Sequence, residues 1–575
     1  MDNNNNNLIV AVILSVIILV GFQYLYIKPQ QEQYRQRVLA ESEVKKANPV
    51  TATANEAAIP RPRTDVIKDD KRIPITTPEL HGSLNLKGAR IDDLSFINFR
   101  ESVAPDSPNI VLLSPSGSAP PNPPYYAEFS WLSDNASIPV PTAQTEWKAD
   151  GRQLTTDQPL KLTWDNGQGL VFERTISVDG HFMFTVDDQV RNKSGSAVTL
   201  YPFGLVARQG DPVTKTISVL YEGPLGVFNG ALEEYKYKKL MDTGKQAVES
   251  EGGWLGITDK YWLVAMVPQP GEKISAAFSY NRANQLAPEQ GWFQTDFRGA
   301  PLTVEAGATS QHSTHFFAGA KRIGLLDKYA DQYNIPHFDR AIDFGWFYFL
   351  TKPFLYLLAF LGNWFGSLGI AILVFTVLLK LVTLPLSLKS YHSMAKMKAL
   401  QPEMKRIQER FADDKVKQSQ EMMEFYKRQK VNPMAGCLPQ LIQIPIFFAL
   451  YKVLYVGIEL RQAPFYGWIK DMSMPDPTSV FTLFGALPIA LPEALHIGIW
   501  PLLMGASMFL QQRLSPQPPD KTQARMFMFM PILFTYMLAR MPSGLVIYWT
   551  WSNLLSILQQ WFIMQQDAKK KVIVE

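Results

Sequence analysis

Long apolar runs divide this chain into a polar first half and an apolar second half. Residues 8–27 form the first run, which is long enough to cross a hydrocarbon core of about 30 Å. Further runs occupy residues 364–388, 438–460, 497–512, 526–540 and 545–564. We therefore predict an α-helical polytopic membrane protein with six transmembrane helices, the first being an N-terminal anchor at residues 1–28.

A cleaved signal peptide is the alternative interpretation of the first run. It requires a basic leader and a cleavage site of small residues. Residues 1–7 contain no Lys or Arg, and residues 23–26 read QYLY. We therefore expect an anchor that is not cleaved.

Residues 344–361 are apolar too, but their composition favours a helix that lies along the membrane surface. The segment is rich in aromatic residues, follows Arg340 and Asp343, and is divided by Lys352 and Pro353. Residues 321–363 are thus predicted to connect the two halves of the chain, and the next crossing to begin at Trp364.

The basic residues predict the orientation. Residues 388–434 hold eleven Lys and Arg against six acids, so this segment is expected in the cytoplasm. With six crossings both termini are cytoplasmic, together with the 513–525 loop and the basic tail at 566–575. Lys28, Arg35 and Arg37 oppose this orientation, but long domains cross largely regardless of charge.

Residues 481–496 are hydrophobic but are interrupted by Pro488 and Pro492. Counting them as a crossing would place the basic segment and the C-terminus on opposite sides. We interpret them as part of an outer loop or a re-entrant element.

The exported half has the pattern of a β protein. Residues 29–72 lack periodicity and predict a flexible tether. Residues 73–320 contain short alternating strands, for example at 169–178 and 181–186, with Asp179 and Gly180 as the turn between them. This pattern predicts one large antiparallel β-sandwich.

Composition excludes several function classes. The single cysteine, Cys437, allows no intrachain disulfide and no multi-thiolate metal site, and a net charge of +4 is too small to indicate nucleic-acid binding. His181, His312 and His315 are scattered, and the chain contains neither a Walker A motif nor G-x-G-x-x-G. We expect no enzyme activity, metal or nucleotide cofactor. The sequence leaves undecided whether the exported domain has a groove that binds a polypeptide or a sugar.

Residues 389–434 predict a cytoplasmic helical hairpin. Five apolar residues of its first helix follow the 3, 4, 3, 4 spacing of a coiled-coil seam: Met397, Leu400, Met404, Ile407 and Phe411. Val416, Met423 and Tyr426 supply a shorter apolar face on the return helix. The hairpin is either a solvated loop that sets topology or a mobile arm that contacts headgroups, a ribosome or an incoming chain.

Lys380 places an ammonium group inside the second predicted crossing. It lies eight residues from the cytoplasmic end, which is a depth of about 12 Å. An exposed lysine there costs about 2.5–3.5 kcal/mol. The side chain either extends to the headgroups or faces a wet cavity. Polar groups in the crossings, including Thr376 and Gln443, favour the cavity.

Two further charges, Lys452 and Glu459, lie in the outer half of the next crossing, where long side chains can reach outward. No other acid lies in the crossings, so we expect no proton relay at Lys380. A cation solvated by water and amides is the better expectation.

Several motifs in residues 344–565 resemble the YidC/Oxa/Alb family of membrane protein insertases. They are MAKMK (394–398), LQP (400–402), QEMM (420–423), VNP (431–433), GCLP (436–439), PIF (445–447), LRQAP (460–464) and PSGLV (542–546). The resemblance implies a five-helix core around a hydrophilic groove in the bacterial inner membrane. It also implies a periplasmic, mutarotase-like super-sandwich without demonstrated catalysis.

The resemblance further implies groove residues and partners. The family's groove positions correspond to Thr376, Lys380, Met508, Met537 and Trp549, and more often carry Arg where this chain has Lys380. Implied partners are nascent inner-membrane proteins, the Sec translocon, ribosomes and membrane lipids, with the protein acting as a monomer. The alternatives are a lipid or small-molecule transporter and an envelope-assembly scaffold that works through the β domain. The transporter predicts inverted repeats and paired ionisable residues, and the chain shows neither. Deleting residues 28–319 distinguishes the scaffold, because insertase activity should survive the deletion.

Overall fold

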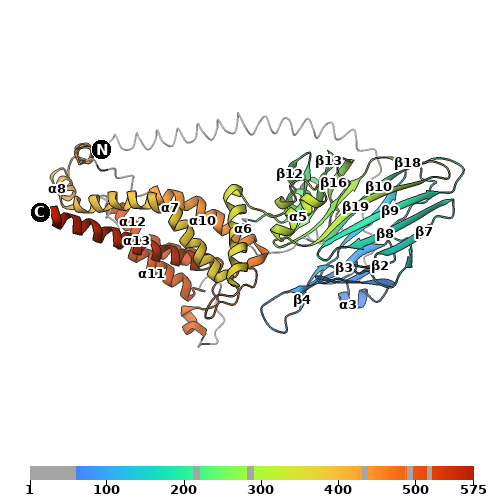
Figure 1. The fold of residues 1–575 in the computed structure, drawn as a ribbon, viewed down its shortest axis with the longest axis horizontal. Helices are drawn as coiled ribbons and strands as arrows, with labels where there is room; N and C mark the ends of the chain where they lie inside the picture. The colour runs from blue at the N-terminus through green and yellow to red at the C-terminus, as the bar shows by residue number, and fades with distance from the viewer. Residues whose placement is uncertain are drawn as a thin grey trace.

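The computed structural model describes residues 60–210, 220–281, 291–429, 431, 438–485, 487, 492, 496–514 and 521–574. The predicted anchor at 1–28 and residues 29–59 of the predicted tether lie outside these residues. Figure 1 shows a body of two β-sheets at one end of the molecule and a body of helices at the other, with helix α6 between them.

Nineteen described strands form two sheets in which neighbouring strands run antiparallel. The order in the first sheet is β1 (Arg72–Thr76), β2 (Leu80–Asn85), β3 (Arg90–Arg100), β5 (Tyr125–Leu132), β10 (Val198–Gln209), β17 (Trp292–Arg298), β16 (Lys273–Asn281) and β13 (Lys245–Glu251), with β4 (Asn109–Leu113) on β3 and β18 (Leu302–Val304) on β10. The second is β12 (Ala231–Glu234), β11 (Gly223–Phe228), β14 (Trp254–Thr258), β15 (Trp262–Val267), β19 (Thr309–Ala320), β9 (Met183–Asn192), β8 (Leu170–Val178), β7 (Leu160–Asp165) and β6 (Lys148–Asp150).

The core of this β domain lies between the two sheets, as the alternating pattern predicts. Along β8 every second side chain from Phe172 onward is buried. Phe129 of the first sheet meets Phe316 of the second edge to face, with ring centroids 5.6 Å apart. The predicted antiparallel sandwich is confirmed, and the predicted turn at Asp179 and Gly180 joins β8 to β9.

The sandwich begins before the predicted boundary at residue 73. Helix α3 (Arg63–Val66) and the preceding segment belong to it. The Arg61 N–H donates to the Gly117 carbonyl over 3.0 Å, and the Arg63 guanidinium pairs with the buried Asp93 carboxylate. An ion pair with a buried acid holds this segment to the sheet, so residues 60–72 are not a tether.

Three short helices leave the sandwich and lead to the helical body. They are α5 (Ile323–Gln332), the 3-10 helix η3 (Phe338–Ala341) and α6 (Tyr348–Phe365); the shorter α4 (Tyr237–Thr243) lies within the β domain. Helix α6 continues through Pro353, so the predicted division at Lys352 and Pro353 is wrong. The break falls at Gly366, with φ +65°, where a left-handed residue ends α6. Ser367 then caps α7 by accepting the Ile370 N–H.

Seven helices form the rest of the described helical body. They are α7 (Leu368–Ala399), α8 (Gln401–Arg410), α9 (Lys415–Arg428), α10 (Leu438–Val456), α11 (Ile499–Leu514), α12 (Lys521–Leu538) and α13 (Ser543–Val574), with the 3-10 turns η5 (Ile458–Leu460) and η6 (Val480–Gly485). Helix α13 packs on α7 and α11, α12 packs on α11, and α6 packs on α7 and α10. By length and composition, α7 is the one described helix that clearly suffices for a membrane crossing. Shorter apolar helical segments occupy Ile442–Val456 and Ala524–Leu538.

The predicted hairpin is present as α8 and α9, but the return helix uses a different face. Met404 packs with Met422 and Phe425. Val416 and Met423, which the sequence pattern assigned to that face, are exposed. Tyr426, the third predicted residue of that face, does pack against the cluster. The turn residue Asp414 caps α9 by accepting the Lys417 N–H.

Candidate functional site in the helical body

The Lys380 side chain points from α7 toward α13. Its Nζ donates to Ser556 Oγ over 2.8 Å. Ser556 Oγ in turn donates to the Ser552 carbonyl of its own helix. Among the described residues, the partner recorded for this ammonium is thus a neutral hydroxyl.

Helix α13 is polar on its buried side and apolar on its exposed side. Tyr548, Ser552, Ser556 and Gln560 follow each other at intervals of four residues, which places them on one helix face, and all four are at most 5% exposed. The opposite side exposes Leu554, Leu558, Trp561 and Phe562. A water-soluble helix has the reverse arrangement. This pattern suits a helix between lipid and a polar interior.

Hydrogen bonds connect this polar face to two other helices. Gln443 Nε2 of α10 donates to the Tyr548 hydroxyl over 2.7 Å. Asn553 Nδ2 donates to Ser507 Oγ of α11 over 2.9 Å. The predicted site residues Lys380 and Gln443 are thus brought to the same helix, α13, from α7 and α10.

Trp549 and Met508 meet in an apolar cluster beside the polar face. The Trp549 ring lies 4.6 Å from that of Phe447 and 5.6 Å from that of Phe534, between centroids. Met508 packs against the same group, around the fully buried Met504. These contacts join α10, α11, α12 and α13.

The two remaining predicted residues are placed differently. Thr376 is buried one turn before Lys380, and its hydroxyl donates to the Ile372 carbonyl of its own helix over 2.6 Å. Met537 is 48% exposed on α12. It lies with the exposed Ile532, Leu533 and Tyr536, outside the polar interior.

Sequence reasoning missed three members of the polar face, namely Tyr548, Ser556 and Gln560. The signal was present, because a spacing of four residues brings them onto one face with Ser552. The hydropathy pattern alone hid it, since each polar residue is surrounded by Leu, Ile and Trp in sequence.

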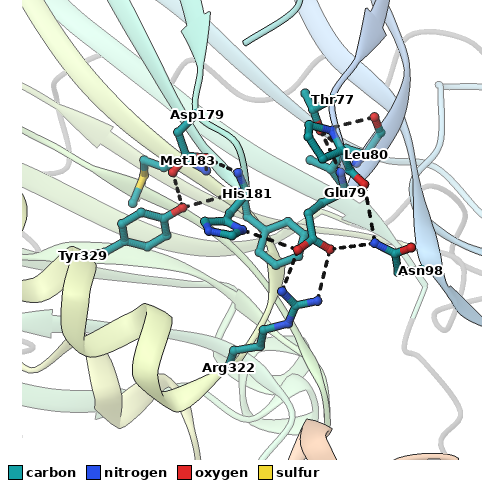
Figure 2. A network of polar contacts seen from close by, with 11 residues as sticks. Thr77, Glu79, Leu80, Asn98, Asp179, His181, Met183, Arg322 and Tyr329 are labelled. Atoms are coloured by element: carbon teal, nitrogen blue, oxygen red, sulfur yellow. Dashed lines mark hydrogen bonds and ion pairs between the residues drawn. The ribbon is translucent and has the colours of Figure 1, made fainter.

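A separate polar network lies in the β domain (Figure 2). The Glu79 carboxylate accepts both ends of the Arg322 guanidinium, at 2.6 and 3.1 Å, and also contacts Asn98 and His181. Burial opposes ionisation of Glu79, but the bonds and charge of Arg322 outweigh it and lower the pKa of the carboxyl. The network fastens the start of α5 to both sheets.

His181, His312 and His315 stay apart in this domain, each with its own neighbour. His181 faces Glu79, His312 Nε2 lies 2.9 Å from Glu272, and His315 Nδ1 lies 3.1 Å from the Thr185 hydroxyl. The described residues contain no cluster of three potential metal ligands. The network around Glu79 holds Arg322, at the start of α5, against the strands.

The fold and this site together define a class: a membrane protein whose helices enclose polar side chains and carry a large β-sandwich. Two family models match the chain and identify its family. Residues 360–571 match the 60Kd inner membrane protein model, and residues 72–357 match the YidC periplasmic domain. The chain belongs to the YidC family of membrane protein insertases.

Curated relatives agree over almost the whole length. The chain is 47% identical to the membrane protein insertase YidC of Methylorubrum extorquens (strain PA1) and 49% identical to that of Methylobacterium nodulans; each alignment covers 99% of this chain and 96% of the relative. A crystal structure of an active YidC insertase overlaps 85% of this chain and 92% of its own, at 17% identity and a TM-score of 0.36, which is too weak to add to the assignment. The protein is an inner-membrane insertase, and its substrates are membrane proteins.

Proposed function

We propose that the polar interior between α7, α10, α11 and α13 is a hydrophilic groove that receives the polar tails of membrane-protein substrates. The observation that carries the proposal is the inverted amphipathicity of α13, whose buried polar face meets Lys380. A buried hydroxyl and amide surface in a membrane lowers the cost of bringing a polar segment into it.

Lys380 supplies the charge of this groove. An ammonium whose partner is a serine hydroxyl keeps its attraction for an incoming carboxylate, since no acid already neutralises it. Acidic tails are therefore favoured. The substrate's hydrophobic helix slides along the exposed apolar surface of α12, which includes Met537, and leaves into the bilayer. Hydrophobic transfer and the membrane potential drive insertion.

The proposal includes a topology and partners. Residues 8–27 together with α7, α10, α11, α12 and α13 form six crossings, and both termini are cytoplasmic. The protein acts as a monomer, alone or with the Sec translocon, on chains delivered by ribosomes, and it catalyses no chemical step. Reporter fusions at either terminus test the orientation, and a periplasmic C-terminus would contradict it.

Charge reversal at Lys380 tests the groove. Lys380→Glu should abolish insertion of a substrate with an acidic tail, because it replaces attraction with repulsion. Lys380→Arg should insert normally, since the positive charge is kept although the shape of the donor changes. The measurement is protease protection of the tail in cells depleted of the native protein. Normal insertion by the Glu variant, at equal expression, would remove the electrostatic part of the proposal.

Crosslinking tests whether the tail enters. A photoreactive residue at Ser556, on the buried face, should crosslink to the polar tail of a stalled substrate. The matched control is Leu558, two residues away and 59% exposed on the other face of α13. Equal tail crosslinking from both positions would contradict a groove on the buried face.

A further inference from the structure

An apolar turn projects from the helical body just before α11. It comprises η6 (Val480–Gly485) and Leu487. Four large apolar side chains are strongly exposed there: Phe481 (51%), Leu483 (61%), Phe484 (52%) and Leu487 (41%). In Figure 1 the segment lies at the edge of the helical body, clear of both sheets.

The base of this turn is held firmly by a buried acid. Asp476 is 3% exposed. Its Oδ1 accepts from Trp468 Nε1 over 3.0 Å and from the N–H and hydroxyl of Thr478, and its Oδ2 accepts the Trp500 N–H over 2.9 Å. Thr478 Oγ1 also accepts the Ile499 N–H. These bonds join Asp476 and Thr478, just before the turn, to the start of α11.

Two residues of the turn have an unfavourable backbone conformation. Leu483 and Phe484 both have left-handed conformations, with φ of +48° and +60°. Such residues cost roughly 1–3 kcal/mol each unless their surroundings stabilise them. Among the described residues, Leu483 and Phe484 thus hold an unfavourable backbone conformation while both side chains are exposed.

The composition and position of the turn indicate that lipid surrounds it. Between Asp476 and Glu493 the chain carries no ionisable side chain. The turn is joined to the start of α11 by the bond from the Val480 N–H to the Ile497 carbonyl, and Leu502 and Leu503 of α11 are exposed as well, so exposed apolar side chains occur in both elements. It also lies on the periplasmic side, because the preceding Arg461 and Gln462 donate to the Arg100 carbonyl of the β domain.

We propose that Phe481, Leu483, Phe484 and Leu487 insert into the outer leaflet and anchor the periplasmic end of α11 among lipid acyl chains. This anchoring site is independent of the substrate groove. Because Asp476 joins the base of the turn to α11, inserting these side chains costs less ordering entropy than it would for a loop without such bonds.

Site-directed spin labelling measures the depth directly. Cys437→Ser removes the single native cysteine, and Phe481→Cys and Phe484→Cys then carry a nitroxide in the full-length protein, reconstituted in phosphatidylethanolamine and phosphatidylglycerol bilayers. The control is Ser196→Cys, exposed beside β18 at the end of the sandwich remote from the helices (Figure 1). Collisions with oxygen should exceed collisions with a nickel chelate severalfold at 481 and 484, and the ratio should reverse at 196.

If water or a second copy of the protein surrounds the turn instead of lipid, the spin-label measurements will differ. Nickel accessibility at 481 and 484 equal to that at 196 would place the turn in water and overturn the proposal. Spin–spin broadening that grows with the protein-to-lipid ratio would instead show a second copy on this surface, and would overturn it too. Quenching of a fluorophore on the same cysteines by brominated lipid is the second measurement, and its absence would also count against lipid insertion.

Discussion

At the residue scale, Lys321 shows how the β domain accommodates a buried ammonium. The residue is 2% exposed. Its Nζ donates to Thr258 Oγ1 over 2.9 Å and to the Ala341 carbonyl over 3.1 Å. Burial lowers the pKa of Lys321 to about 8, although Asp259, Glu222 and Asp343 act in the opposite direction. The charged form is therefore costly at neutral pH.

This predicts a pH dependence of stability. The native pKa of Lys321, about 8, lies below the ordinary value of 10.5. Between these values the unfolded chain binds more protons, so the free energy of unfolding rises with pH. Relative to Lys321→Met, the wild-type protein should gain at most about 3 kcal/mol between pH 7 and pH 10.5. The measurement is thermal unfolding of both proteins in the same detergent. Parallel pH profiles would contradict the prediction.

A single residue can be selected from the sequence where a charge interrupts an apolar run. Lys380 stood out because a charge in a hydrophobic run is costly, and the structure gives it a polar partner. Ser556, the partner itself, could not be chosen from the sequence. A serine costs little in an apolar helix and can satisfy its hydroxyl on its own backbone, so hydropathy does not mark it. Only the packing of α13 on α7 selects it.

At the element scale, the start of α11 depends on a residue outside the helix. Asp476 and Thr478 accept the first N–H groups of α11, at Trp500 and Ile499. The intervening Gly498 has no room for a side chain, because a Cβ there would lie 2.4 Å from Asp476 Cγ and 2.6 Å from its Cβ. The capping residue Asp476 therefore requires a glycine at position 498, because its side chain fills the space that a Cβ there would need.

A double-mutant cycle tests the coupling between Asp476 and Gly498. Gly498→Ala should destabilise the protein by about 1–3 kcal/mol through overpacking. Asp476→Gly should cost a similar amount, because it leaves buried donors unpaired. Together they should cost less than the sum, since removing the Asp476 side chain frees the space that the new methyl needs. Asp476→Ala keeps the Cβ and should give little relief. Additive effects in thermal unfolding would contradict the coupling.

Element boundaries were the least predictable feature. Pro353 suggested a division of the long apolar segment, yet a helix tolerates proline when neighbouring groups satisfy the freed carbonyl. Gly366 and Ser367 instead carry the real signal, a left-handed residue followed by a cap. The sandwich was easier to predict, because strands with one buried face repeat every second residue. Its start at Arg63 depends on an ion pair with a distant strand.

At the scale of the whole molecule, charged side chains join the two bodies. Lys352 of α6 reaches Asp339 of η3 over 2.7 Å and Asp327 of α5 over 3.2 Å. Lys452 of α10 pairs with Asp343 over 2.7 Å. The Lys260 ammonium of the β domain lies 3.8 Å from the centre of the Tyr455 ring. Most of these partners lie after residue 319, so the connector is bonded to the helical body, while Arg322 and Tyr329 hold α5 to the sheets through Glu79 and Asp179.

This division predicts which part of the protein inserts substrates. Removing residues 28–319 should leave insertion of a simple substrate largely intact, because Lys352 and Lys452 keep Asp327, Asp339 and Asp343. The yield should fall, since the buried face of α5, with Leu326 and Tyr329, loses its cover. Extending the deletion through residue 343 is the matched comparison and should lower insertion further, because it removes the three acids that pair with Lys352 and Lys452. Protease protection of the substrate measures both. Loss of insertion in the shorter deletion, at equal membrane abundance, would assign an essential role to the sandwich and favour the envelope scaffold.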